Sequence, residues 1–415
     1  MRSPFQYWRF IRYALPGLPL AALGLPFYIY APLWLAEQGG YGYTLVGAVF
    51  FIARFSDVVS DLPVGAWVDR RGSHRLLWLG SWVLIAASAL ALALIPHPWP
   101  PLMLGLFLVL LMLGWTGLTV PWLALPVNLS EHNIDRLRYN SSREGILLFG
   151  TLLAMLAPVL LAPSALPSAL AILLGVLLLA VYLQGSQNPL EESNPTLSFK
   201  VLLGDSRVRS LALPWFVNML ANAIPGTVLL LFMREVLGAE DMVPLALLSY
   251  FLAGLIGVPF WYFLARKIGD LTSWRIGLCS SAVLFSFAAF LGEGDVYWFI
   301  AISVGTGLAL GADQALPSAM QTGLAQALSK EHGGAAIGAR MFALWSMLSK
   351  AAMGLAVGVS YLWLGSQAEL LVPPVWAITA VYVVAPVVLK LVVYFMLGRL
   401  PVAWVGGRQV YEQGN

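Results

Sequence analysis

Charged side chains are scarce in this chain, since Asp, Glu, Lys and Arg make up only 10% of its 415 residues. A soluble domain carries about 25%. Hydrophobic residues account for 60% of the chain and the mean hydropathy is +0.81, so the composition excludes an ordinary soluble domain and predicts an integral membrane protein. Cys279 is the single cysteine, which excludes a disulfide framework and a cysteine-rich metal site.

The usual marks of an enzyme are also missing. The sequence contains no G-x-x-x-x-G-K-[ST] loop, which argues against ATP hydrolysis. The four histidines lie in predicted loops without metal-site spacing; they are His74, His97, His132 and His332. We therefore expect a protein that is not an enzyme and has no cofactor and no structural metal ion.

Long apolar runs are what the sequence has in abundance. A span needs about 20 residues to cross a hydrocarbon core of about 30 Å. The sequence predicts an all-α membrane protein with twelve such spans, near residues 15–36, 43–67, 75–95, 101–126, 144–163, 166–184, 211–233, 243–265, 274–291, 297–325, 339–364 and 374–398.

Basic residues collect in the loops predicted on one side of the membrane, together with both termini. The opposite loops contain Arg234 and several acidic residues instead. By the positive-inside rule both termini are predicted to be cytoplasmic, in a bacterial inner membrane. The net charge of +3 is thereby explained by topology, and we expect no nucleic-acid partner.

A polar connector near the middle divides the predicted spans into two sets of six. The predicted organisation is an N-terminal half over 1–184, a cytoplasmic connecting loop over 185–210, a C-terminal half over 211–398 and a cytoplasmic tail over 399–415. The segments 65–75 and 257–269 echo each other, because each places a basic pair before a glycine. Two such halves with a midplane site between them form a carrier that works by rocking.

Six charged residues lie well inside predicted spans: Arg54, Asp57, Asp61, Asp313, Lys350 and Lys390. Arg54, Asp57 and Asp61 are spaced by three and four, which stacks them on one helix face. Intramembrane acids are costly and point to an ion or solute pathway. Lys390, near the predicted end of the last span, is expected to snorkel. The other five sum to −1, which one bound Na⁺ or H⁺ would neutralise.

Other polar residues in the spans allow two interpretations each. Asp57 and Asp61 are either cation ligands, helped by the hydroxyls of Ser60, Thr116 and Thr119, or a structural pair neutralised by Arg54 and Lys350. Asp313 either lines a solute cavity or pairs with Lys350. Asn218 and Asn222, four apart, serve either helix packing or solute binding.

The run GAWVDRRGSHR at the cytoplasmic end of the second span has a different character. It is either a basic loop that only sets topology or a latch in which an acid and nearby arginines pair with helix ends of the opposite half. The candidate gate residues are Gly65, Asp69, Arg70, Gly72 and Arg75.

These motifs resemble the glycoside–pentoside–hexuronide:cation symporters of the major facilitator superfamily. GAWVDRRGSHR matches the superfamily's G-x-x-x-D-R-x-G-x-x-R loop, and R-x-x-D-x-x-x-D in span 2 is similar to the branch's cation motif. The resemblance implies cation-ligand roles for Asp57, Asp61 and Thr116. It also carries over Arg136 and Arg143 from the loop between spans 4 and 5, and Lys350 from span 11.

The chain departs from this branch at the expected solute site. Thr119 replaces an aspartate of span 4, Leu123 stands in place of a tryptophan, and the first span has no acid. The residues expected to line the solute cavity are Arg54, Trp122, Arg143, Asn218, Asn222, Asp313 and Lys350. The cation motif is thus retained, whereas the galactoside site is not.

The sequence therefore predicts a secondary transporter that carries a small organic solute, sugar- or glycoside-like by resemblance, in symport with Na⁺ or H⁺ by alternating access. One alternative is a proton-coupled exporter or a lysolipid or amphiphile transporter on the same fold. A second is a receptor or assembly factor that does not transport. The expected partners are the solute and membrane lipid, and the expected oligomeric state is a monomer.

Overall fold

The computed structural model describes residues 4–24, 27, 35, 40–41, 43–71, 75–95, 99–130, 132–160, 165–184, 197–367 and 373–400. In these residues the regular structure is helical, with no β-strand, which confirms the all-α prediction. Much of the first predicted span (15–36), of the connecting loop (185–210) and of the tail (399–415) lies outside the described residues, as does Gly72.

Nine helices within the described residues are long and apolar enough to cross a membrane. Three predicted spans are not among them. Of the first predicted span, 15–36, the structure describes only 15–24, 27 and 35, and α1 (Pro4–Ala14) precedes it. Helix α3 (Tyr43–Arg71) carries Arg54, Asp57 and Asp61 in its middle, and α6 (Asn133–Leu160) begins with a polar stretch.

Contacts between Cα atoms divide the chain into two compact units. The first unit comprises Met1–Glu131, Ser142–Ser198 and Ala325–Met347, and the second comprises His132–Ser141, Phe199–Leu324 and Leu348–Asn415. Each unit is drawn mainly from one half of the sequence and takes a short segment from the other half. The predicted boundary at the connecting loop stays a prediction.

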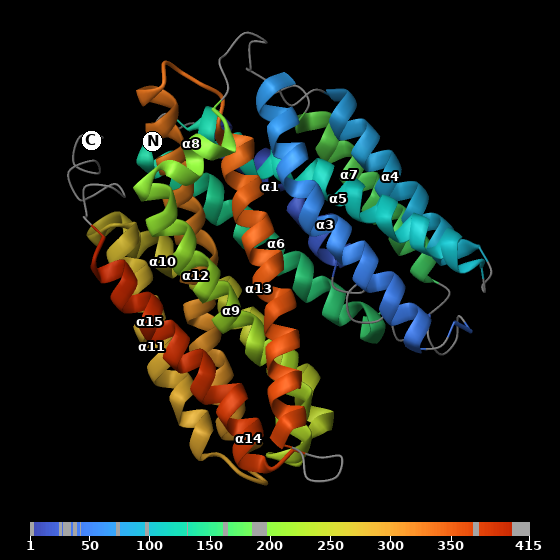
Figure 1. Ribbon diagram of the computed structural model, residues 1–415, viewed down its shortest axis with the longest axis vertical. Helices are drawn as coiled ribbons and strands as arrows, with labels where there is room; N and C mark the ends of the chain where they lie inside the picture. The colour runs from blue at the N-terminus through green and yellow to red at the C-terminus, as the bar shows by residue number, and fades with distance from the viewer. Residues whose placement is uncertain are drawn as a thin grey trace. The chain divides into compact units, whose positions relative to one another are not determined.

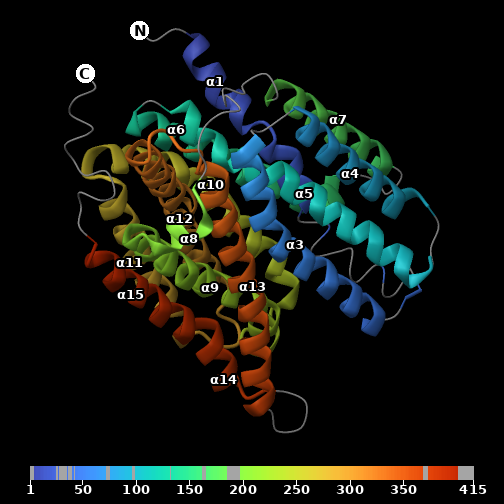
Figure 2. The same cartoon turned by 45° about the horizontal axis from the view of Figure 1, so that its top comes forward.

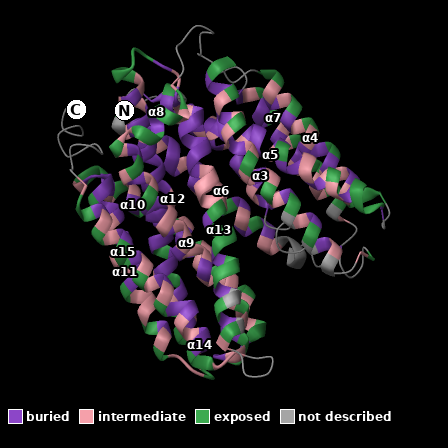
Figure 3. Cartoon of the chain, viewed as in Figure 1, coloured by how far each residue is buried: buried purple, intermediate pink, exposed green. Residues whose placement is uncertain are grey.

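In the first unit, α5 (Pro101–Leu129) packs against both α3 and α4 (Arg75–Leu94), and α4 packs against α7 (Leu166–Gln184). These helices lie side by side in both ribbon views (Figures 1 and 2). Gly114 allows the close approach of α5 to α4, because a Cβ there would lie 2.8 Å from the Ser81 carbonyl oxygen. In the most apolar stretch of α5, 50% of the residues are buried, whereas in that of α7 only 28% are. Figure 3 shows the buried residues of both helices.

In the second unit, α15 (Ala385–Gly398) packs against α9 (Ser206–Glu235) and α11 (Asp270–Ser286), and α10 (Val243–Ile268) packs against α11. A Cβ on Gly311 of α12 (Val296–Glu331) would lie 2.6 Å from the Val258 nitrogen, so α12 approaches α10 closely. The rings of Phe232 and Tyr382 stack with centroids 4.1 Å apart, and Tyr382 lies in a π-helical turn over Ala380–Val384. The remaining helices are α8 (Phe199–Gly204), α13 (Gly338–Gln367) and α14 (Val375–Thr379).

The first helix is interrupted at Pro16 and resumes over 17–24. Proline has no N–H, so the Arg12 carbonyl loses its helical donor. The Gln184 side chain donates to that carbonyl, and the Trp122 indole donates to the Tyr13 carbonyl over 2.8 Å. Side chains of α5 and α7 thus satisfy backbone groups at the break, as a helix in lipid requires.

Candidate functional site

Asp57 and Asp61 of α3 converge on one hydroxyl of α5. The Thr116 Oγ1 atom lies 2.9 Å from Asp57 Oδ1 and 3.3 Å from Asp61 Oδ1. The two acids are 1% and 0% exposed, and Thr116 is 0% exposed. The i, i+4 spacing of the acids places both on the face of α3 that packs against α5. Ser60 adds a hydroxyl 3.4 Å from Thr116 Oγ1.

The Thr116 hydroxyl lies between two carboxylate acceptors. A single Thr116 hydroxyl proton cannot be donated fully to both carboxylates. Two carboxylates that contact the same hydroxyl are close enough to repel each other when both are ionised. A proton on one acid, or a small cation held between the oxygens, removes that repulsion. The cluster is therefore chemically suited to take up one positive charge.

The other two residues expected near the cation lie differently. The Thr119 hydroxyl donates to the Trp115 carbonyl of its own helix over 2.9 Å. Thr119 is thus bonded one turn further along α5, and no direct bond joins it to either acid in the described residues. Arg54 is half-buried on α3, three residues before Asp57.

Asp69, at the C-terminal end of α3, caps the start of α13. Its carboxylate accepts hydrogen bonds from the backbone N–H groups of Ala339 and Arg340, each over 2.9 Å. The Arg340 guanidinium adds an ion pair of 3.2 Å. A carboxylate at a helix N-terminus also interacts favourably with the helix dipole. Gly65 permits the contact, because a Cβ there would lie 2.5 Å from the Ala343 Cβ.

The Asp69 carboxyl has a perturbed proton affinity. Burial raises its pKa to about 6, although the hydrogen bonds from Arg340 and Ala339 act in the opposite direction. The other gate candidates lie outside this contact. Arg70 is exposed, and the Arg75 guanidinium lies 4.5 Å from the centroid of the Tyr182 ring.

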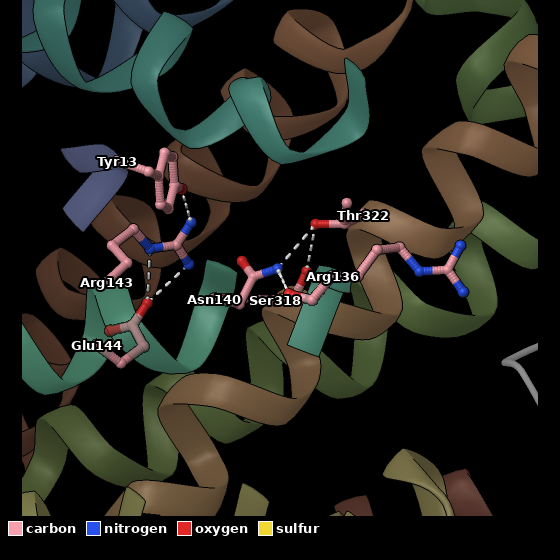
Figure 4. Close-up of polar contacts among 7 residues, drawn as sticks. All are labelled: Tyr13, Arg136, Asn140, Arg143, Glu144, Ser318 and Thr322. Carbon is pink, nitrogen blue, oxygen red and sulfur yellow. Dashed lines mark hydrogen bonds and ion pairs between the residues drawn. The ribbon is translucent and has the colours of Figure 1, made fainter. Parts of the chain in front are cut away.

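Arg143 of α6 is 1% exposed and is held in a small polar cluster. Its Nε and Nη2 atoms donate to Glu144 Oε1 over 3.0 and 2.7 Å. Its Nη1 atom donates to the Tyr13 hydroxyl over 3.1 Å (Figure 4). Trp122 lies beside this cluster, with its ring centroid 5.9 Å from that of Tyr13. Glu144 and Tyr13 are residues that the sequence analysis did not assign to the site.

Arg136, expected in the same loop as Arg143, belongs to the second unit. A Cβ on Gly323 would lie 3.1 Å from its guanidinium carbon, so the arginine packs over that glycine. One turn further along α6, Asn140 donates to the Thr322 hydroxyl over 3.2 Å (Figure 4). Both contacts join the start of α6 to α12 within the second unit.

Asp313 of α12 forms a buried ion pair with Lys390 of α15, with 2.7 Å between Nζ and Oδ2. The Trp274 indole donates to Asp313 Oδ1 over 2.9 Å, and the Asn222 amide donates to Oδ2 over 3.3 Å. The expectation that Lys390 snorkels was wrong, since it is 6% exposed. Of the two interpretations of Asp313, the ion pair is present, but its partner is Lys390 instead of Lys350.

The two asparagines of α9 therefore differ. Asn222 joins the Asp313 cluster. Asn218, one turn earlier, is 0% exposed, and within the described residues neither of its amide atoms has a hydrogen-bond partner. Lys350 is half-buried on α13, in the second unit.

A family model described as MFS/sugar transport protein matches residues 12–403 of the chain. The chain belongs to this family. Membership makes this chain an integral membrane transport protein rather than an enzyme.

Solved structures share the fold of this MFS protein at low identity. A bacterial homologue of the iron transporter ferroportin, in an outward-facing state, is similar with a TM-score of 0.71 and 16% identity, covering 95% of this chain and 98% of that one. The fucose:proton symporter of E. coli is similar with a TM-score of 0.69 and 14% identity, covering 94% and 97%. These likenesses show the fold alone.

One curated relative also matches. An uncharacterized symporter of Synechocystis is 28% identical over 164 residues. That match covers 35% of this chain and only 29% of the relative. What that protein does as a whole therefore applies here only as a proposal.

Proposed function

We propose that this MFS protein is a cation-coupled symporter for a small organic solute, of the melibiose-permease-like branch. The observation that carries the proposal is the convergence of Asp57, Asp61 and Thr116 on one buried point. The proposed setting is a bacterial inner membrane with both termini in the cytoplasm, and the proposed form is a lipid-embedded monomer that binds no nucleic acid.

The charge of the cluster supports cation coupling. Asp313 is neutralised by Lys390 in the second unit, so the earlier sum over five residues no longer applies. In the first unit, Arg54, Asp57 and Asp61 still sum to −1 when both acids are ionised. One Na⁺ or one H⁺ would neutralise that charge. The hydroxyls of Thr116 and Ser60 would complete an oxygen-rich site for either ion.

The Asp69 contact is the proposed cytoplasmic gate. Closing it satisfies two N–H groups at the start of α13 that have no partner within the helix. Opening it exposes Asp69, Arg340 and these N–H groups to water, which can hydrate all of them. The contact can therefore form and break at modest cost, as alternating access requires.

A transport assay in proteoliposomes tests the coupling site. A panel of radiolabelled sugars and glycosides would be offered under an inward Na⁺ gradient, an inward H⁺ gradient or neither. We expect uptake with one gradient in the wild type. Asp57→Asn should abolish the gradient dependence, and Thr116→Val should raise the cation concentration for half-maximal uptake about tenfold, because a ligand of about 1.4 kcal/mol is lost.

Two controls accompany these variants. Asp241→Asn makes the same change at an exposed site, and Thr151→Val removes a hydroxyl that donates only to the Leu147 carbonyl of its own helix. Full gradient-dependent uptake by Asp57→Asn would refute the coupling site. Proton-driven export of amphiphiles, with no solute uptake, would favour the exporter alternative.

A further inference from the structure

The Arg143 guanidinium has an unusual counter-ion, because the acid that neutralises it is the next residue in the chain. Glu144 Oε1 accepts from both Nε and Nη2 of Arg143. The Arg143 side chain is 1% exposed, whereas that of Glu144 is 9% exposed. Both side chains are buried, and Glu144 is the more exposed of the two.

The hydrogen bonds of this pair are incomplete. A guanidinium has five N–H donors, and Arg143 uses three of them, two on Glu144 and one on Tyr13. Glu144 Oε2 makes no hydrogen bond among the described residues, since both bonds from Arg143 use Oε1 (Figure 4). The buried arginine therefore keeps donors in reserve for a second acceptor.

Few other titratable groups face the pair. From α1, Tyr13 touches Arg143 through its hydroxyl, while Arg12 is bonded to the Leu183 carbonyl and Arg9 lies over the Phe10 ring. The side chains that α5 and α7 bring to Tyr13 are Trp122 and Gln184, and neither titrates. Protonation of Glu144 would leave the Arg143 charge without a counter-ion.

We propose that Arg143 recognises the carboxylate of an organic anion, and that Glu144 frees the guanidinium for it by taking up one proton. This inference rests on the proposed transport function and deepens it by naming the substrate class. In the exchange, the Glu144 carboxylate becomes a neutral carboxylic acid as the solute carboxylate takes over its place on Nε and Nη2. One proton and one anion enter together, so the net charge of the buried site does not change.

The need to keep the buried site electrically neutral favours an anion over a neutral solute. A neutral hydroxyl that displaced Glu144 would leave two buried charges separated, and breaking a buried pair in this way is strongly destabilising. A carboxylate replaces the lost pair with an equivalent charge-assisted, two-bonded contact. If Arg143 and Glu144 form only a structural ion pair, no anion binds to them. If they form the proposed site, anion binding depends on pH.

Thermal unfolding of the purified full-length protein in detergent, with and without ligand, tests the proposal. The ligands are an acid and its matched alcohol, gluconate against glucitol, and an amphiphilic pair, octanoate against octanol. The two pairs distinguish a polar solute from a lipid-like one. We expect the acid of one pair to raise the melting temperature while its alcohol does not, with an affinity that falls about tenfold per pH unit at alkaline pH, as one linked proton requires.

Variants separate recognition from structure. Glu144→Gln mimics the protonated acid, so anion binding should become independent of pH, and a pH-indicator dye should detect no proton uptake. Arg143→Gln should lose anion binding. Glu240→Gln, the same change at an exposed residue of the 3₁₀ turn Glu240–Met242, should behave as wild type.

Three results would overturn the anion assignment: stabilisation by the alcohols as strong as by the acids, stabilisation by none of the four compounds, or unchanged pH dependence in Glu144→Gln. Na⁺ binding by the same preparation, and its loss in Asp57→Asn, is measured separately. If that coupling survives while the anion test fails, the proposed symport stands with a neutral solute. If anions bind but Asp57 is dispensable, the coupling site is wrong instead.

Discussion

Replacing Lys390 by methionine should destabilise the protein strongly, although the change swaps a charge for an apolar side chain inside a membrane protein. Lys390 supplies the ion pair to Asp313 Oδ2 at 2.7 Å. Trp274 and Asn222 still donate to the carboxylate in the variant, but neither carries a positive charge. Removing one partner of a buried pair costs about 3–5 kcal/mol, and the two remaining donors place our expectation near the lower end of that range.

The double variant Lys390→Met/Asp313→Asn should recover most of that loss. The asparagine that replaces Asp313 is neutral, and its side-chain oxygen can still accept from the Trp274 indole. Replacing both members of a buried pair by neutral residues is often close to neutral in stability. The two substitutions should therefore be non-additive, with a coupling energy of at least about 3 kcal/mol, because each single variant breaks the same buried pair.

The measurement is the free energy of unfolding in mixed micelles titrated with SDS, followed by tryptophan fluorescence. Lys200→Met, the same change at an exposed residue, is the control. A snorkelling lysine would tolerate methionine with little loss. Wild-type stability of Lys390→Met, or a double variant that loses the sum of the two single losses, would refute the reasoning.

Two further predictions concern the proposed gate. Gly65→Ala places a Cβ 2.5 Å from the Ala343 Cβ, so overpacking should lower the free energy of unfolding by about 1–3 kcal/mol. The control Gly80→Ala, where a Cβ has nothing within 4 Å, should not lower it. Equal melting temperatures of the two variants would contradict this prediction. Because burial raises the pKa of Asp69 to about 6 from 3.8, its stabilisation is fully present below about pH 4 and is lost as the pH rises through 6. The melting temperature of wild type relative to Asp69→Asn should fall between about pH 4 and 6, and a constant difference would argue against the buried contact.

Local spacing was enough to predict that Asp57 and Asp61 lie together, because i and i+4 share a helix face whatever surrounds the helix. The sequence also offered Thr116 as a partner, on condition that the second and fourth spans pack together, and α3 does pack against α5. The gate candidates followed from a loop motif, yet the motif did not show that Asp69 meets the N–H groups of Ala339 and Arg340.

The contacts that sequence reasoning missed are set by packing between distant segments. Lys390 and Asp313 are far apart along the chain, and no periodicity relates α12 to α15. Glu144 was missed for a different reason. The predicted span began at residue 144, at the edge of the apolar run, whereas α6 begins at Asn133. A buried acid therefore looked like the end of a loop.

The break in the first helix ties the identity of one residue to that of another on α7. While Pro16 deprives the Arg12 carbonyl of its helical donor, Gln184 supplies a substitute. Among homologous sequences the two positions should therefore covary, with the glutamine retained where the proline is present and free to drift where it is not. A genetic counterpart follows: a defect caused by Gln184→Leu should be suppressed by Pro16→Ala, which restores the backbone donor.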